Sequence, residues 1–358
     1  MRFRTFSFPT SVLTAVFVAG GICLTSTPAH ADDLGQAQSF NFFIFGNATN
    51  TSDAQGRTAV GGNATYTNFP IGQQDYNVFG QLKDQLIVGG ALSYTGGQIF
   101  GNAAATSAPT FTGTFPGSPQ GPGGSLRTGS GNLPFNPASF LSSYQSRSTY
   151  YASLANSFGG GSITQSGGGN FITYNLTGTN AGLNVFNLSS STLAANPGFV
   201  INVPATATAL INITGNTTNN AGVGAGITFT NSNITFSGGG ADKRTLFNLS
   251  SATQVNVSGY RIQGSLLAPN ASVVGANGAS QDGTLIASGV SGQFEGHIID
   301  EGNNYTGTIG SGTIASTVLF QGSLPTVVTA APEPGSVALL GVGFIGMVGM
   351  SARRKTRS

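Results

Sequence analysis

The sequence predicts a mainly β protein: a right-handed or irregular β-solenoid with one long packed helix. The first observation is a repeat, because residues 264–273 return almost in register as residues 283–292, an offset of 19 residues (283 − 264). At about 3.3 Å per residue, this length suits one lap of a coil made of three short strands and their corners. Leu266 then lies over Leu285, and stacked apolar positions give neighbouring rungs a shared core.

Two further repeats support the same fold. Gly-Asn-Ala-Thr at residues 46–49 recurs at residues 62–65, and Phe-Asn-Leu-Ser-Ser at residues 186–190 recurs at residues 247–251, about three laps later. Because the repeats run through most of the 358 residues, we expect a single solenoid domain over residues 32–315.

The N-terminus is typical of an exported protein. Arg2 and Arg4 precede an apolar run at residues 12–24, and Ala29-His-Ala31 forms a small-x-small cleavage site. We therefore expect a signal peptide over residues 1–31, handled by the Sec machinery and recognised at Ala29 and Ala31. The one cysteine, Cys23, lies within it, so the mature chain should have neither a disulfide nor a thiol nucleophile.

Composition supports export and argues against nucleic-acid binding. Only 7% of the residues are charged, and 55 are glycine. Six of the 13 basic residues lie in the terminal segments, which leaves seven basic and ten acidic residues between Asp32 and Ala331. No basic patch is expected there, and nucleic acid is not an expected partner.

The body should begin with short strands and then be interrupted. From Phe40 to about Ala105, short alternating runs are separated by Gly-Gly or Gly-Asn pairs, a pattern that predicts strands joined by tight corners. Residues 106–132 contain four prolines among many glycines, so we expect an irregular surface loop there.

One helix is predicted at about residues 137–158, between the loop and the later strands. Asn136 is a suitable N-cap, Pro137 suits the first helical position, and Phe135 can pack against Phe140. Apolar residues then recur at helical spacing and should lie against the solenoid. The stripe consists of Phe140, Tyr144, Tyr151, Leu154 and Phe158.

The C-terminal segment has a different character. We expect residues 316–331 to form a linker. Residues 332–358 contain Pro-Glu-Pro, an apolar run nearly long enough to span a bilayer, and a basic end. These features resemble the PEP-CTERM sorting signal, which implies a transient inner-membrane anchor and processing by an exosortase. The resemblance assigns the signal to Pro332, Glu333, Pro334, Arg353, Arg354 and Lys355.

The body resembles the choice-of-anchor A family, which is similar to ice-binding-like adhesive domains. The resemblance rests on an apolar strand that leads into Gly-Asn-Ala at residues 40–48, a second such segment at residues 56–64, and a closing rung at residues 264–271. It implies a solenoid with one helix inserted after the first rungs, and it implies no enzymatic activity. Residues 292–297 depart from the family's Gly-x-Phe-His segment, so no role is carried over to His297.

Little in the sequence points to catalysis, a cofactor or a metal. After export only His297 remains among histidines and cysteines, and Gly-x-Ser-x-Gly does not occur. Acidic residues near the end of the body are the nearest approach to an acidic pair of the kind that cleaves polysaccharides, or to a Ca²⁺ site. They are Asp282, Glu295, Asp300 and Glu301.

Threonine pairs offer a candidate ligand surface. Thr49 and Thr51 recur as Thr65 and Thr67, and residues two apart on a strand share a face. Such a face would suit ice or a sugar chain, although threonine is also an ordinary strand residue. We therefore expect a non-catalytic, adhesive or structural protein of the cell surface, extracellular matrix or biofilm, with exopolysaccharide as a possible partner. An ice- or carbohydrate-binding module and a polysaccharide-active enzyme are the alternatives.

Overall fold

The computed structural model describes residues 34–50, 52–79, 82–118, 120–155, 161–216, 226–230, 233–237, 242–298 and 320–326. All of them belong to one compact unit, residues 31–358. The predicted signal peptide, the predicted C-terminal membrane helix and the Pro-Glu-Pro signal lie outside the described residues. Within the described part of the chain, no helix is long and apolar enough to cross a membrane.

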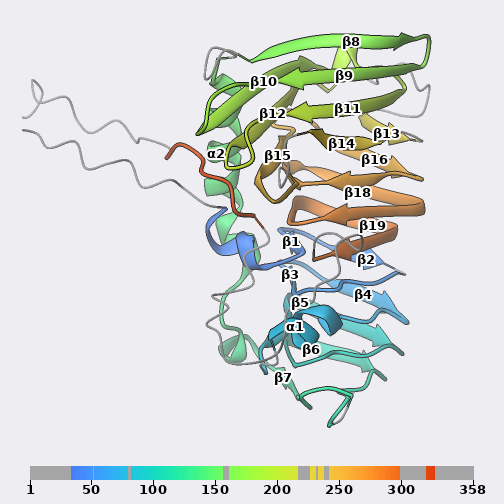
Figure 1. Cartoon of the computed structure of the whole chain (residues 1–358). Coiled ribbons are helices and arrows are strands. Elements are labelled where there is room, and N and C mark those ends of the chain that lie inside the picture. Colours follow the sequence, from blue (N-terminus) through green and yellow to red (C-terminus); the bar gives the residue numbers. More distant parts are fainter. Residues whose placement is uncertain are drawn as a thin grey trace, which may run out of the picture. The chain divides into compact units, whose positions relative to one another are not determined.

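The described residues form a mainly β structure of stacked rungs, as predicted (Figure 1). Every strand pairing is parallel except that of β8 with β9. The strands before the long helix are β1 (Phe42–Ile44), β2 (Ala48–Asn50), β3 (Thr58–Val60), β4 (Ala64–Thr67), β5 (Asp84–Thr95), β6 (Asn102–Phe111) and β7 (Leu126–Thr128).

Twelve strands follow the helix within the described residues. They are β8 (Ser162–Gly168), β9 (Phe171–Thr177), β10 (Leu183–Ser189), β11 (Asn196–Asn202), β12 (Thr208–Thr214), β13 (Ile227–Thr230), β14 (Ile234–Ser237), β15 (Thr245–Asn248), β16 (Gln254–Ser258), β17 (Arg261–Gln263), β18 (Ser265–Asp282) and β19 (Leu285–His297). Short 3-10 helices are η1 (Gly35–Ser39), η2 (Ser130–Asn132), η3 (Pro137–Phe140), η4 (Ser190–Thr192) and η5 (Asp242–Arg244).

The rung repeats predicted from the sequence stack as expected at two places. Leu266 pairs with Leu285 on β18 and β19, and Thr49 pairs with Thr65 on β2 and β4. The third repeat was placed wrongly, because Phe186 and Phe247 are separated by a single intervening strand, β12, and so lie two laps apart rather than three. The two laps span 25 residues (211 − 186) and 36 residues (247 − 211), both longer than 19.

The first described strand lies in the middle of the stack. β1 pairs with β3 on one side and with β19, the last strand, on the other. β2 also pairs with β19, and a single bridge joins Ala54 to Gly296. The first rung therefore lies against the last along its whole length, and we call this contact the seam. Figure 1 shows β1 and β2 beside β19, with the earlier strands continuing in one direction and the later strands in the other.

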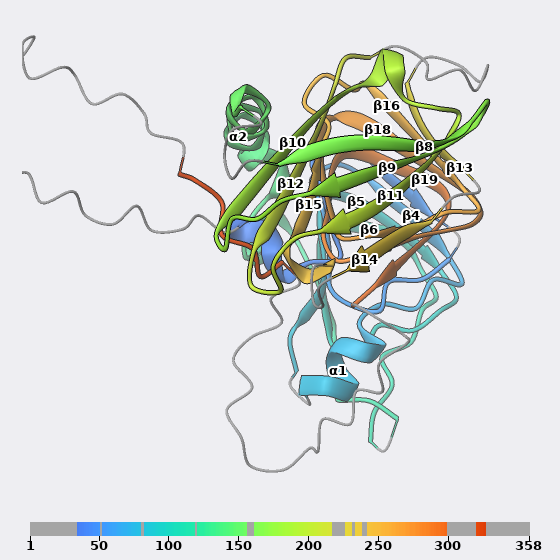
Figure 2. The same cartoon turned by 45° about the horizontal axis from the view of Figure 1, so that its top comes forward.

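Two apolar cores hold the rungs together. One fills the coil and contains Ile44, Val60 and Leu285, among others. The second lies outside the coil between the strand face of β1, β3 and β19 and the long helix, and it includes Phe43, Ile286 and Tyr144. Both sides of these strands are thus buried, which explains their nearly continuous apolar sequences. Figure 2 shows the helix, α2, standing outside the coil beside β10 and β12.

The predicted helix is confirmed at its start but ends earlier. The side chain of Asn136 accepts from Ala138 N at 3.0 Å, η3 follows, and α2 spans Leu141–Ser153. Leu154 has extended backbone, which buries its side chain, and its carbonyl accepts from the side chain of Asn187 at 2.8 Å. These contacts explain why the helix stops before residue 158, and Phe158 lies outside the described residues.

Two segments expected to be irregular are regular or packed in part. β6 continues to Phe111 through Pro109, because beyond Ala105 only β5 lies beside it and an edge strand tolerates a missing N–H. Within the predicted linker, Phe320 and Leu324 are buried in the core beneath α2. Gln321 N donates to Lys243 O at 2.8 Å, so residues 320–326 pack against the body.

Candidate functional site

One strand face carries hydroxyl side chains in register across four rungs. Thr49 of β2 pairs with Thr65 of β4, Thr65 pairs with Ser93 of β5, and Ser93 pairs with Thr110 of β6. Ser93 is half-buried and the three threonines are exposed. Since adjacent strands lie about 4.8 Å apart, these side chains form an evenly spaced column.

A second column runs beside the first. Thr67 pairs with Thr95, and Thr112 lies next to Thr95, with its Oγ1 accepting from Gly96 N at 3.0 Å. All three threonines are exposed. We call the two columns together the hydroxyl ladder: Thr49, Thr65, Ser93 and Thr110, with Thr67, Thr95 and Thr112.

Aromatic side chains on the opposite side of these strands support the ladder. Tyr66, Tyr94 and Phe111 alternate with the ladder residues and point inward, and the rings of Tyr94 and Phe111 stack with centroids 5.5 Å apart. The Tyr94 hydroxyl donates to Phe69 O. Burial raises the pKa of both Tyr66 and Tyr94, so these phenols stay neutral. The ladder therefore rests on a close-packed base.

The ladder extends one rung across the seam and then stops. Ser291 of β19 pairs with Thr49, but the next residue in the column is Val274 of β18. The hydroxyl array thus belongs to the N-terminal rungs and the seam.

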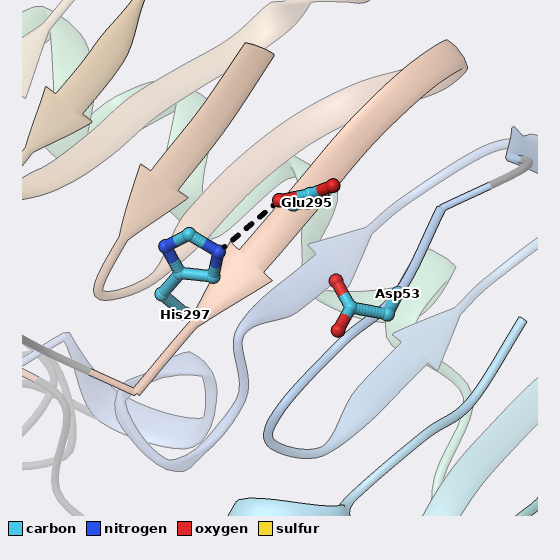
Figure 3. Close-up of side chains that lie close together, drawn as sticks. All are labelled: Asp53, Glu295 and His297. Atoms are coloured by element: carbon cyan, nitrogen blue, oxygen red, sulfur yellow. Dashed lines mark ion pairs between the residues drawn. The ribbon is translucent and has the colours of Figure 1, made fainter. Parts of the chain in front are cut away.

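Charged and polar side chains gather at the other side of the seam, on an adjacent face of the coil. We call Asp53, Asp282, Glu295 and His297 the seam cluster. Asp53 follows β2, whereas Asp282 ends β18 and Glu295 and His297 lie at the end of β19. In Figure 3, Glu295 and His297 point toward one another and Asp53 faces them from the neighbouring chain segment.

His297 links the two acidic residues near it in sequence. Its Nδ1 lies 3.1 Å from Asp282 Oδ1, and its Nε2 lies 3.4 Å from Glu295 Oε2. Arg261 Nε donates to the other Asp282 oxygen at 2.6 Å. Asp282 is 3% exposed and His297 is 7% exposed, so both are held rigidly.

Glu295 lies at the edge of a small hollow. Its Oε1 accepts from Ser52 Oγ at 2.8 Å, and its side chain is 41% exposed. The hollow has a volume of about 200 Å³ and is lined by Ser52, Gly278, Ala279, Gln293 and Glu295. Solvent therefore reaches one side of the seam cluster.

Sequence reasoning found part of each site. Thr49, Thr65 and Thr67 come together as expected, while Thr51, Asp300 and Glu301 lie outside the described residues. The sequence analysis did not identify the rest of the ladder, which consists of Ser93, Thr95, Thr110 and Thr112. Ser93 and Thr95 are two residues apart, as are Thr110 and Thr112, and this spacing is the same as in the predicted pairs. Asp53 was missed because nothing in the sequence indicates that the first and last rungs meet.

The fold and the ladder define the class of this protein: a parallel β-solenoid that presents one polar strand face to solvent. The chain belongs to the family described as "Putative Ice-binding-like adhesive domain", which matches residues 33–298. Residues 330–355 match the PEP-CTERM protein-sorting motif. The two matches indicate an exported surface protein whose precursor is transiently held in the membrane. No curated protein matches the chain.

Solved structures with a remote likeness are ice-binding proteins. That of the Antarctic ascomycete Antarctomyces psychrotrophicus is 14% identical, with 75% of this chain and 98% of that chain covered and a TM-score of 0.35. The glycosylated LeIBP from an Arctic yeast is 14% identical, with 74% and 94% covered and a TM-score of 0.32. An ice-binding protein from an Antarctic Biological Consortium is 11% identical, with 74% and 88% covered and a TM-score of 0.28.

Proposed function

We propose that the protein is a non-catalytic adhesive or structural component of the extracellular matrix, and that it holds its target through the hydroxyl ladder. The ladder is the observation that carries this proposal, because it gathers seven small hydroxyl side chains in two columns on one face, and six of them are exposed. Hydroxyl groups both donate and accept hydrogen bonds, which suits an extended polysaccharide with its own repeating hydroxyls.

The seam cluster favours a structural rather than a hydrolytic role. Enzymes that cleave glycosidic bonds place two carboxyl groups on either side of the bond, with open space between them. Asp282 is buried and already bound to Arg261 and His297, so it has no such access. Of Asp282 and Glu295, only Glu295 has a side chain that reaches solvent.

Binding of the purified full chain to exopolysaccharide from the native host tests the proposal. Thr65→Lys/Thr95→Lys places two long, charged side chains on the ladder, at exposed positions where the fold should tolerate them. The matched control is Thr164→Lys/Thr235→Lys, which makes the same change at exposed threonines of β8 and β14. We expect the ladder variant to bind at least about tenfold more weakly and the control to bind normally. Equal binding by both variants would refute the role of the ladder.

Ice binding is the second candidate function, and the even spacing of the ladder favours it. The same two variants serve in a test of how much protein a slowly growing ice hemisphere takes up. Uptake of the wild type and the control, with exclusion of the ladder variant, would establish ice as a target. Exclusion of the wild type would remove this candidate.

The exosortase step is also part of the proposal. Intact-mass analysis of host fractions should find the wild type shortened near Pro332 at the cell surface. The variant Pro332→Ala/Glu333→Ala/Pro334→Ala should remain whole in the inner membrane. If both proteins remain whole in the membrane, the tail is an ordinary anchor and the exosortase proposal is wrong.

A further inference from the structure

The seam cluster brings together metal-ligating side chains from the two rungs that close the stack. Asp53 comes from the first rung, and Glu295 and His297 come from the last. One ligand atom from each of the three lies within 4.8 Å of those of the other two. Ligands about 2.0–2.2 Å from one ion lie about 3–4.4 Å apart, so small side-chain movements would bring all three atoms to a shared ion.

The orientation of His297 supports a ligand role for its Nε2. One carboxylate oxygen of Asp282 lies 3.1 Å from Nδ1 and the other accepts from Arg261 Nε at 2.6 Å, so Nδ1 is the ring nitrogen placed to donate to Asp282. In the tautomer that carries its proton on Nδ1, Nε2 has a lone pair, and this nitrogen lies 3.4 Å from Glu295 Oε2. A carboxylate that orients a histidine through its remote nitrogen is the usual outer partner of a metal-bound histidine.

The charges at the cluster fit a divalent cation. Arg261 neutralises Asp282, and the carboxylates of Asp53 and Glu295 both face His297 (Figure 3). Two carboxylates and the ring nitrogen Nε2 converge on one point, and a divalent ion bound there would satisfy all three. The alternative occupant of that point is a proton on Nε2, which would make His297 an imidazolium.

The hollow beside Glu295 provides access. Ser52 holds Glu295 Oε1 at 2.8 Å, which leaves Oε2 toward the cluster. About 200 Å³ of open space is enough for water molecules that would complete the coordination. One imidazole nitrogen with two carboxylates suits Zn²⁺, Co²⁺ or Mn²⁺, whereas Ca²⁺ prefers oxygen ligands throughout.

We propose that Asp53, Glu295 and His297 bind one divalent transition-metal ion of the zinc class, which ties the first rung to the last. The site is independent of the hydroxyl ladder and of the proposed adhesive function. Its consequence is structural: the ion joins two strands whose side chains lie more than 240 residues apart in sequence, as the contact between Ser52 and Glu295 does across 243 residues.

The test is titration of the full chain, first stripped with a chelator, with Zn²⁺ and separately with Co²⁺, whose absorption spectrum reports its ligands. We expect one ion per chain and a rise in Tm of more than about 3 °C in excess Zn²⁺. Asp53→Asn, Glu295→Gln and His297→Gln should each weaken binding by about tenfold or more. The control Asp242→Asn changes an acidic residue on η5 and should bind as the wild type does.

Several outcomes would overturn the proposal. The first is no saturable binding of either ion. Another is unchanged binding by His297→Gln, and a third is preference for Ca²⁺ over Zn²⁺. If His297→Gln fails to fold, metal binding by Asp53→Asn replaces it as the test, and unchanged binding by that variant overturns the proposal. Asp53 is only half-buried, and the substitution preserves the shape of its side chain. NMR of the chelated protein shows whether His297 carries a proton on both ring nitrogens. If it does, and Zn²⁺ does not displace the Nε2 proton, that proton and not a metal ion occupies the position between the carboxylates.

Discussion

Asn248 and Asn212 lie on neighbouring rungs, and Asn248 Nδ2 donates to Asn212 Oδ1 at 2.8 Å. Asn212 Nδ2 donates in turn to Asn187 Oδ1 at 2.7 Å, on the next rung. This ladder of amides sits beneath α2, and each asparagine also donates to a carbonyl of the helix segment. These bonds are Asn187 to Leu154 at 2.8 Å, Asn212 to Tyr151 at 2.8 Å and Asn248 to Ser148 at 2.9 Å. The amide ladder therefore fixes the position of α2 along the stack.

Asn248→Ala should lower the free energy of unfolding by about 3 kcal/mol. The substitution leaves the buried Asn212 Oδ1 and the Ser148 hydroxyl and carbonyl without this partner, and unpaired buried polar groups are costly. Urea denaturation measures the change. The matched control, Asn270→Ala, removes an exposed asparagine and should cost less than about 1 kcal/mol. Equal costs for the two variants would contradict this account of α2.

Tyr66 and Tyr94 should respond differently to loss of their hydroxyl groups. Among the described residues, the buried Tyr66 hydroxyl has no hydrogen-bond partner, whereas that of Tyr94 donates to Phe69 O. Tyr66→Phe should therefore leave stability unchanged or raise it, and Tyr94→Phe should cost about 1 kcal/mol. Thermal denaturation of the two variants checks this, and the opposite order would show that the hydrogen bonding beneath the ladder is different.

Stability should fall as the pH rises above about 10. Burial raises the pKa of Tyr66, Tyr94 and Tyr260 in the folded protein above the ordinary value near 10. Above that pH the unfolded chain releases these protons while the folded chain keeps them, so the unfolded state is favoured. Denaturation midpoints between pH 8 and 11 should show the decline, and Tyr66→Phe should make it shallower. A flat profile to pH 11 would contradict the prediction.

Gly61→Ala should destabilise the junction between the first rungs and the helix. A Cβ at Gly61 would lie 2.2 Å from Phe45 O and 2.6 Å from Ala138 N, both of them backbone atoms that cannot move aside cheaply. We expect a cost of about 3 kcal/mol or more. Gly117→Ala is the matched control, because no atom lies within 4 Å of the added Cβ. Similar denaturation curves for both variants would count against close packing at Gly61.

The sequence predicts the rungs because their information is local. The repeated segments are separated in sequence by about one lap of the coil. The stacking of Leu266 on Leu285 and of Thr49 on Thr65 therefore follows from this separation alone. The start of the long helix is equally local, since Asn136, Pro137 and Phe140 are close in sequence. The helix end depends on Asn187, a tertiary partner, and so was placed too late. The short helix α1 (Gln73–Phe79) has only seven residues and gives no periodic signal.

The seam lay beyond the reach of sequence reasoning. Strand order in the stack departs from chain order, and no pattern at Asp53 points to Glu295. The sequence indicates Asp282 and Glu295 as acidic candidates. Asp53, which completes the proposed metal site with Glu295 and His297, comes from the other end of the domain. Phe320 and Leu324 could not be recognised as core residues for the same reason. They lie in a segment predicted to be a linker, and the core that buries them beneath α2 is formed by residues distant in sequence.

The proposed adhesive function requires the hydroxyl ladder to attach the exported protein to its surroundings. The most direct measurement is the fraction of exported protein that stays in the extracellular matrix when host cells produce the wild type, Thr65→Lys/Thr95→Lys or Thr164→Lys/Thr235→Lys at equal levels. We predict that the ladder variant appears mainly in the culture medium, while the wild type and the control variant stay in the matrix. Retention of all three proteins to the same extent would contradict the claim and place the adhesive surface elsewhere.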